Sequence, residues 1–188
     1  MSHNPLKKAD NRVFYKTVIA LVLPMALQNL INVGVSSADV IMLGQVSETV
    51  LSAASLAGQV QFIMTLVFFG LTSGAAVLTA QYWGKGDTRT IEKVMGIAMR
   101  FSLIVGLAFT LAAWLIPETL MSIYTSEPEV ISEGCKYLRI VAVAYIPISI
   151  TTIYLNIMRS VERVVISTVV YLISLITNVI LNAVFIFG

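Results

Sequence analysis

One carboxylate stands inside an otherwise apolar stretch near the start of the sequence. Asp39 follows the uncharged run Thr17–Ala38 and is the only acidic residue clearly within a predicted membrane-crossing segment. A carboxylate in hydrocarbon costs about 2.5–3.5 kcal/mol, so it is kept where it faces polar groups or water. An acid in that setting can exchange a proton or hold a sodium ion. The spacing supports equally that Asp39 is an interfacial residue, one turn before Gly44.

Uncharged polar residues recur at helical spacing on four apolar segments. On the first segment they fall within about 80° of arc, at about 100° per residue. Such a stripe either lines a watery cavity or joins neighbouring helices by hydrogen bonds of about 0.6–2 kcal/mol each. The stripes alone leave both interpretations open. The residues that we expect to line a cavity are Gln28, Asn32, Ser36, Gln61, Thr65, Tyr145, Ser149, Thr152, Tyr171 and Ser174.

A proline interrupts the same segment that carries Asp39. Pro24 has no backbone N–H, so the carbonyl of Ala20 loses its usual partner and a kink is expected. A kinked helix can act as a gate, and we predict Pro24 to be a hinge. The alternative is that Pro24 shapes the helix without moving.

The sequence contains no recognisable enzyme signature. The one histidine, His3, lies in the N-terminal tail, and Cys135 is the one cysteine. These two residues cannot form an internal disulfide, a zinc site or a histidine-based triad. We therefore expect neither an enzyme nor an organic cofactor.

The composition predicts an all-α, polytopic transmembrane helix bundle. Apolar residues make up 57% of the 188 residues and charged residues 12%, about half the share usual in soluble proteins. Five uncharged runs are close to the roughly 20 residues that cross a bilayer as a helix. Residues 1–16 form a basic tail, and 17–188 form the bundle. The predicted spans are 17–43, 50–81, 93–116, 134–158 and 164–187.

Basic residues alternate between the two ends of the predicted spans. The connections after the first and third spans carry no lysine or arginine. The positive-inside rule then places the N-terminus in the cytoplasm, in the cell's inner (plasma) membrane. Lys136 and Arg139 depart from the rule, since they lie at the outer start of the fourth span. The residues that set the orientation are Lys7, Lys8, Arg12, Lys16, Lys85, Arg89, Lys93, Arg159 and Arg163.

Two connections between the predicted spans have local structure that the sequence predicts, a turn in one and a short helix in the other. Gly84–Asp87 is predicted to be a turn. The third connection is apolar enough for a short helix along the outer interface, with Pro128 in the first turn of the helix that follows. The residues that suit the short helix are Leu120, Met121, Ile123 and Tyr124.

Several motifs, in order, resemble those of the multidrug and toxic compound extrusion (MATE) transporters, in their N-terminal portion. Pro24 and Asp39 stand 15 residues apart, followed by Met42 and Gly44. Ala80–Asp87 is similar to the family's Q-x-x-G-x-G-[DN] turn after its second helix. The other matching segments are Glu127–Val130 with Tyr137–Ile140, and Asn178–Asn182 with Phe185–Gly188.

This resemblance implies an ion-coupling site. In one branch of the family the first-helix aspartate and polar groups on the fifth helix form the ion-linked site. The resemblance therefore nominates Asp39, Asn178 and Asn182 as the ion-coupling residues of this chain. Within that set, Asp39 and Asn178 are nominated as ligands of a sodium ion. Two departures are visible. Asn182 stands where that branch often has an aspartate, which removes a negative charge. The segment Arg159–Arg163 lacks the glycine common in the corresponding connection.

The resemblance also implies a fold and a function. The family has two six-helix lobes, so five spans make an incomplete N-terminal lobe. The implied activity is secondary antiport, in which cationic or lipophilic compounds leave the cell in exchange for protons or sodium. The implied partners are a small cationic substrate, the lipid bilayer, and the missing C-terminal lobe or another copy of the chain, with no nucleic acid. Two alternatives stay open: a related flippase of lipid-linked oligosaccharides, and a non-transporting subunit or inert fragment.

Overall fold

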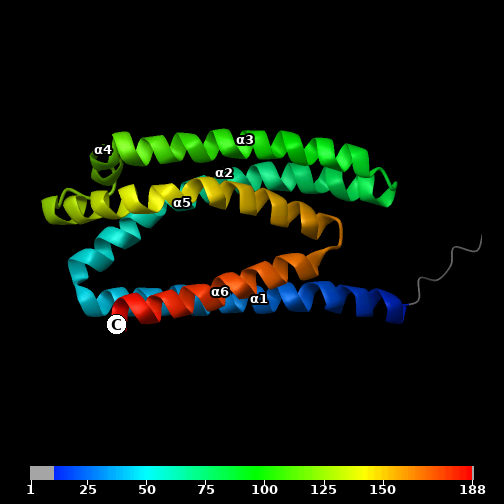
Figure 1. Cartoon of the computed structure of the whole chain (residues 1–188), viewed down its shortest axis with the longest axis horizontal. Coiled ribbons are helices and arrows are strands. Elements are labelled where there is room, and N and C mark those ends of the chain that lie inside the picture. Colours follow the sequence, from blue (N-terminus) through cyan, green and yellow to red (C-terminus); the bar gives the residue numbers. More distant parts are fainter. Residues whose placement is uncertain (1–10, 188) are drawn as a thin grey trace, which may run out of the picture. The chain divides into compact units, whose positions relative to one another are not determined.

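The computed structural model is built of helices, and it describes the backbone of residues 11–187. Within that range it describes most side chains; those outside the description are 11–14, 17, 21, 28, 35, 38–39, 41–46, 164, 179 and 182–187. Six helices follow one another along the chain (Figure 1): α1 (Asn11–Val46), α2 (Glu48–Gly84), α3 (Thr88–Leu115), α4 (Pro117–Ser122), α5 (Pro128–Ser160) and α6 (Val164–Phe187).

These helices divide into two compact units. One unit comprises residues 1–36 and 164–188, and therefore holds most of α1 together with α6. The other comprises residues 37–163 and holds α2 to α5. Each unit is described by itself below.

In the larger unit, α2, α3 and α5 each contact the other two. Helices α2 and α5 run in one direction and α3 in the opposite one (Figure 1), as expected for successive crossings of a bilayer. Two groups of buried apolar side chains form the core, one around Met64, Phe68 and Leu138 and the other around Ile91, Ile153 and Ile157. Burial of these side chains holds the three helices together.

Among the residues that the structure describes, three helices are long and apolar enough to cross a membrane: α2, α3 and α5. The second, third and fourth predicted spans overlap these helices, and the bounds of the spans stay a prediction. The other two predicted spans fall within α1 and α6, whose apolar stretches among the described residues, Val18–Gly34 and Val165–Asn178, are shorter. Most helices extend past the predicted ends, because charged residues that end an apolar run do not end a helix.

Local sequence explains where the helices begin. The Oγ of Ser47 accepts the backbone N–H of Thr49 (3.2 Å) at the start of α2, which satisfies one of the unpaired donors of the first turn. The predicted turn Gly84–Asp87 is confirmed: Gly86 has a φ of +74°, and Asp87 caps α3 by accepting the backbone N–H of Thr90 (3.1 Å).

The expected short helix is present as α4, and Pro128 occupies the first turn of α5 as predicted. Met121 on α4 is fully buried, with its terminal atoms packed over Gly134 of α5. The absence of a side chain at Gly134 provides the space for Met121. In contrast, Ile123, just after α4, is 70% exposed. Met121 therefore packs α4 onto α5, while Ile123, just past the end of α4, faces outward.

Candidate functional site

A cavity lies between α1 and α6 in the smaller unit. It has a volume of about 110 Å³. Three residues that the sequence nominated separately line it: Pro24, Asn32 and Tyr171. The remaining lining residues are Leu27, Ile31, Thr168 and Leu172. The structure therefore brings together polar groups from two distant segments around one space.

The cavity has apolar walls with a few polar groups. Asn32 contributes an amide, and Thr168 and Tyr171 contribute hydroxyls, while none of the lining residues carries a formal charge. Ligand sites are commonly built in this way, with apolar surface for affinity and a few polar groups for orientation. The chemistry offered is hydrogen bonding to an uncharged or weakly polar group in an apolar setting.

Pro24 lines the same cavity and lies within the continuous helix α1. Because proline has no N–H, the helix there lacks one hydrogen bond of its ladder. The weakened turn therefore borders the space that a ligand would enter. The role of Pro24 as a hinge stays a prediction.

The other nominated residues of α1 and α6 do not line this cavity, or have side chains that the structure does not describe. Ser36 is exposed, and Asn178 is half-buried on α6. Ser174 is exposed, and its Oγ donates to the carbonyl of Val170 on its own helix (2.9 Å). The side chains of three nominated residues lie outside the described part of the chain: Gln28, Asp39 and Asn182. The ion-coupling set Asp39, Asn178 and Asn182 thus stays a prediction.

In the larger unit the nominated side chains lie between helices or on the surface. Tyr145 and Ser149 are fully buried: Ser149 packs against Gly106 of α3, and Tyr145 belongs to the apolar core that α5 shares with α2 and α3. Gln61 and Thr152 are half-buried, and Thr65 is exposed. None of the five lines the cavity between α1 and α6 or the groove formed by α4 and α5.

Hydroxyl groups in this unit are satisfied within their own helices. Thr72, Thr79, Thr110 and Ser149 each donate to the carbonyl four residues earlier, at 2.7–2.9 Å. A serine or threonine can therefore be buried in an apolar helix interface without any water. Tyr145 cannot bond in this way, because its hydroxyl lies at the end of a long ring; that hydroxyl is buried with no partner among the described residues.

Sequence reasoning missed some of the cavity and of the helix contacts. Thr168 lines the cavity and stands three residues before Tyr171, so its position on the same face was available as a signal. The close contact of Gly106 with Ser149 was not identified, because nothing in the spacing shows which glycine meets another helix. Gly70 and Gly74, four residues apart, and Gly58, four residues after Ala54, have the small-x-x-x-small spacing of a packing motif, but each has open space around it.

Comparison with known proteins agrees with the motifs. The profile of the MatE family matches residues 24–184. The chain is 27% identical to a protein of Rhizobium meliloti (strain 1021) described as "Probable multidrug resistance protein NorM", over 97% of the chain and 39% of that relative. A protein of Agrobacterium fabrum with the same description is 24% identical, over 93% of the chain and 37% of the relative.

A third relative differs in its described cargo. It is a protein of Shewanella oneidensis described as "FAD transporter", 22% identical over 79% of the chain and 33% of the relative. The chain therefore spans roughly two-fifths or less of the length of these curated relatives. Because one family profile covers nearly the whole chain, from the first helix to the last, the chain belongs to the MatE family of multi-pass membrane transport proteins, which are not enzymes.

Proposed function

We propose that this chain forms part of a secondary active antiporter that exports cationic or lipophilic compounds in exchange for protons or sodium ions. Membership of the MatE family and the description of its relatives as multidrug resistance proteins support this function. Since the chain spans about two-fifths of those relatives, a C-terminal lobe or a second copy of the chain would complete the transporter.

The observation that carries the proposal is the cavity shared by Asn32 and Tyr171. Helices α1 and α6 run in the same direction within their unit (Figure 1). The ion site that belongs to this proposal rests on the family motifs, which nominate Asp39, Asn178 and Asn182.

The cavity, at about 110 Å³, is smaller than the roughly 300–1,000 Å³ of small-molecule sites, so it would hold an apolar part of a lipophilic cargo and not the whole molecule. Its lining combines apolar side chains with uncharged polar groups. A phosphate-bearing cargo, such as the one in the description of the Shewanella relative, would favour a basic residue in the wall, and none lines this cavity. A cationic group on the cargo would instead be attracted by the carboxylate of Asp39, which couples cargo binding to release of the ion.

Orientation in the membrane follows from the exposed basic residues. Lys85, Arg89 and Lys93 are exposed around the connection between α2 and α3, and Arg163 is exposed between α5 and α6. The positive-inside rule supports a cytoplasmic location for both connections, and hence for the N-terminus, in the inner membrane. Cargo would therefore move from the cytoplasmic side outward.

The test uses the complete transporter that contains this segment, purified into lipid vesicles with either a proton or a sodium gradient. We expect Asp39→Asn to abolish gradient-driven movement of a cationic dye such as ethidium. Glu92→Gln, which removes an exposed carboxylate from α3, is the matched control and should transport normally. The gradient that drives the unchanged protein identifies the ion. Dye transport by Asp39→Asn at the control rate would reject the ion-coupling role.

A labelling experiment checks the surroundings of Asp39 independently of transport. These 188 residues contain one cysteine, so Cys135→Ala, with every cysteine in the rest of the complete transporter also changed to alanine, gives a background without thiols. In that background Asp39→Cys should react with a water-soluble maleimide, because the proposed site is reached by ions. Val40→Cys is the control, since Val40 is an exposed apolar residue that should face lipid and react slowly. Equal, slow reaction at both positions would contradict the proposal.

A further inference from the structure

A groove between α4 and α5 contains the two basic residues that depart from the orientation rule, Lys136 and Arg139. The groove is open and has a volume of about 710 Å³, within the range of about 300–1,000 Å³ common for sites of small organic molecules. Its other lining residues are Glu118, Thr119, Ser122, Pro128, Ile131, Ser132 and Cys135. The groove thus combines both signs of charge with several hydroxyl groups.

Two of the charges in this groove are available to a ligand. Lys136 is paired with Glu133, with 2.6 Å between Nζ and Oε1. Glu118 on α4 and Arg139 on α5 form no ion pair with any residue that the structure describes. A carboxylate and a guanidinium, from different helices, therefore face one open space without neutralising each other. Such a site suits a ligand that carries both a cationic and an anionic group.

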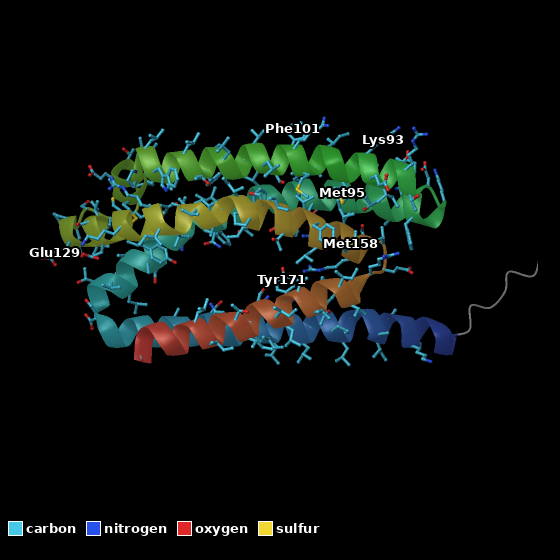
Figure 2. All side chains as sticks on the ribbon, in the orientation of Figure 1. Lys93, Met95, Phe101, Glu129, Met158 and Tyr171 are labelled. Carbon is cyan, nitrogen blue, oxygen red and sulfur yellow. The ribbon has the colours of Figure 1, made fainter. Side chains whose placement is uncertain are left out.

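The groove lies at the edge of the apolar surface of the unit. Ile140, next to Arg139, is 75% exposed, and Leu115, at the end of α3, is also 75% exposed. The indole N–H of Trp114 donates to the carbonyl of Arg139 (2.9 Å). Tryptophan near the end of a membrane helix is typical of the headgroup region. The start of α5, marked by Glu129 in Figure 2, lies at the same end of the unit as α4.

We propose that this groove binds the headgroup of a zwitterionic phospholipid that has a primary amine, such as phosphatidylethanolamine. The guanidinium of Arg139 donates hydrogen bonds to the phosphate oxygens, and the carboxylate of Glu118 accepts them from the ammonium group. The acyl chains lie over the exposed side chains of Ile140 and Leu115. An anionic lipid such as phosphatidylglycerol lacks the amine and would meet the charge of Glu118, while the quaternary amine of a choline lipid has no N–H to donate.

The test measures which lipids the complete, purified protein retains. Native mass spectrometry after incubation with equimolar phosphatidylethanolamine, phosphatidylglycerol and phosphatidylcholine should show preferential retention of the ethanolamine lipid. Arg139→Gln and Glu118→Gln should each lower that retention roughly fivefold, the scale of one partly exposed charged contact. The matched controls are Arg100→Gln and Glu92→Gln, two exposed residues of α3 that do not line the groove.

A second measurement locates the bound lipid. Trp83→Phe, with every tryptophan outside these 188 residues also changed to phenylalanine, leaves Trp114, beside Arg139, as the one tryptophan. Phosphatidylethanolamine with brominated acyl chains should quench Trp114 fluorescence more strongly than the brominated glycerol lipid, and Arg139→Gln should remove the difference. Equal retention of the three lipids by the unchanged protein, or retention by the groove variants equal to that of the controls, would overturn the proposal. The test does not depend on export activity.

Discussion

Ser149 of α5 packs directly against Gly106 of α3, with no space for a side chain at position 106. A Cβ placed on Gly106 would collide with the Oγ of Ser149 and lie 3.2 Å from its Cβ and from the carbonyl oxygen of Tyr145. One turn further along α3, the hydroxyl of Thr110 donates to the carbonyl of Ala142 (3.1 Å). Close approach at Gly106 thus permits a hydrogen bond between the two helices, as is common for small residues in membrane proteins.

Replacing Gly106 with alanine should destabilise the larger unit. Overpacking a tight contact costs about 1–3 kcal/mol, so thermal unfolding in detergent should occur at a lower temperature for Gly106→Ala. Gly96→Ala is the matched control on the same helix, because nothing lies near Gly96. The control should be neutral or slightly stabilising, since alanine favours helix.

A double-mutant cycle identifies the cause. Ser149→Ala removes the oxygen with which the new methyl group would collide, so Gly106→Ala should cost less in that background. Equal costs of Gly106→Ala in both backgrounds would show that the Oγ of Ser149 is not what restricts position 106.

A second contact between helices joins α2 to α5. The hydroxyls of Thr72 and Thr79 are both buried and both donate to carbonyls of their own helix. Of these two hydroxyls, the Thr79 hydroxyl also lies within hydrogen-bond distance of a second helix: it is 2.5 Å from the Oγ of Ser160 on α5. Thr79→Val should therefore cost more stability than Thr72→Val, by about 0.6–1.7 kcal/mol, measured by thermal unfolding of each variant. Equal costs would mean that the bond to Ser160 adds nothing.

The sequence was sufficient to locate the helices of the larger unit. Uncharged runs bounded by charges predicted α2, α3 and α5, and Pro128 and the Gly84–Asp87 turn were found as expected. The predicted start of the fourth span at 134 lies six residues inside α5. Hydropathy measures the part of a helix that suits lipid, whereas the helix itself continues through Glu129 and Glu133 into the aqueous boundary.

The environment of individual side chains was harder to predict. Helical spacing placed Asn32 and Tyr171 on polar faces but did not show that they share a cavity, because pairing of distant helices depends on shape along their whole length. The same spacing grouped Tyr145 and Ser149 with the cavity residues but did not show that both are buried among α2, α3 and α5, with Ser149 against Gly106. Helical spacing of polar residues shows which of them share a helix face, but it does not show which element packs against that face.

The cap of α3 makes a prediction about pH. The hydroxyl of Thr90 donates to Oδ2 of Asp87 (2.6 Å) and, with the backbone N–H of Thr90, holds the pKa of Asp87 below its ordinary value. Because the folded-state pKa is lowered, the cap stabilises the fold above the unfolded-state pKa and is lost as pH falls through the folded-state value. This connection lies outside the membrane-spanning segments.

Thr90→Val should raise the pKa of Asp87 toward its ordinary value, measured by carboxyl carbon NMR in micelles. Thr88→Val is the control, since its side chain forms no hydrogen bond to Asp87. The first turn of α3 should also lose amide protection at a higher pH in Thr90→Val. A titration of Asp87 that is the same in both variants would contradict the role of the Thr90 hydroxyl.

The end of α5 lies in the segment Arg159–Arg163, which lacks the glycine common in the family. Glu162 has a φ of +62°, in the left-handed region. Its N–H donates to the carbonyl of Arg159 (3.1 Å), and that of Arg163 donates to the carbonyl of Met158 (2.9 Å). This pair of bonds is the Schellman motif, whose left-handed position is usually glycine because a Cβ there crowds the following carbonyl.

Glu162→Gly should therefore stabilise the chain by about 0.5–1 kcal/mol, since relief of strain exceeds the greater freedom of glycine in the unfolded state. Glu162→Val should destabilise it, because a branched side chain fits the left-handed region least well. Glu162→Gln keeps the Cβ while removing the charge, so it should leave the unfolding temperature close to that of the unchanged protein. If glutamine stabilises as much as glycine does, the charge of Glu162, and not its backbone conformation, is the source of the strain.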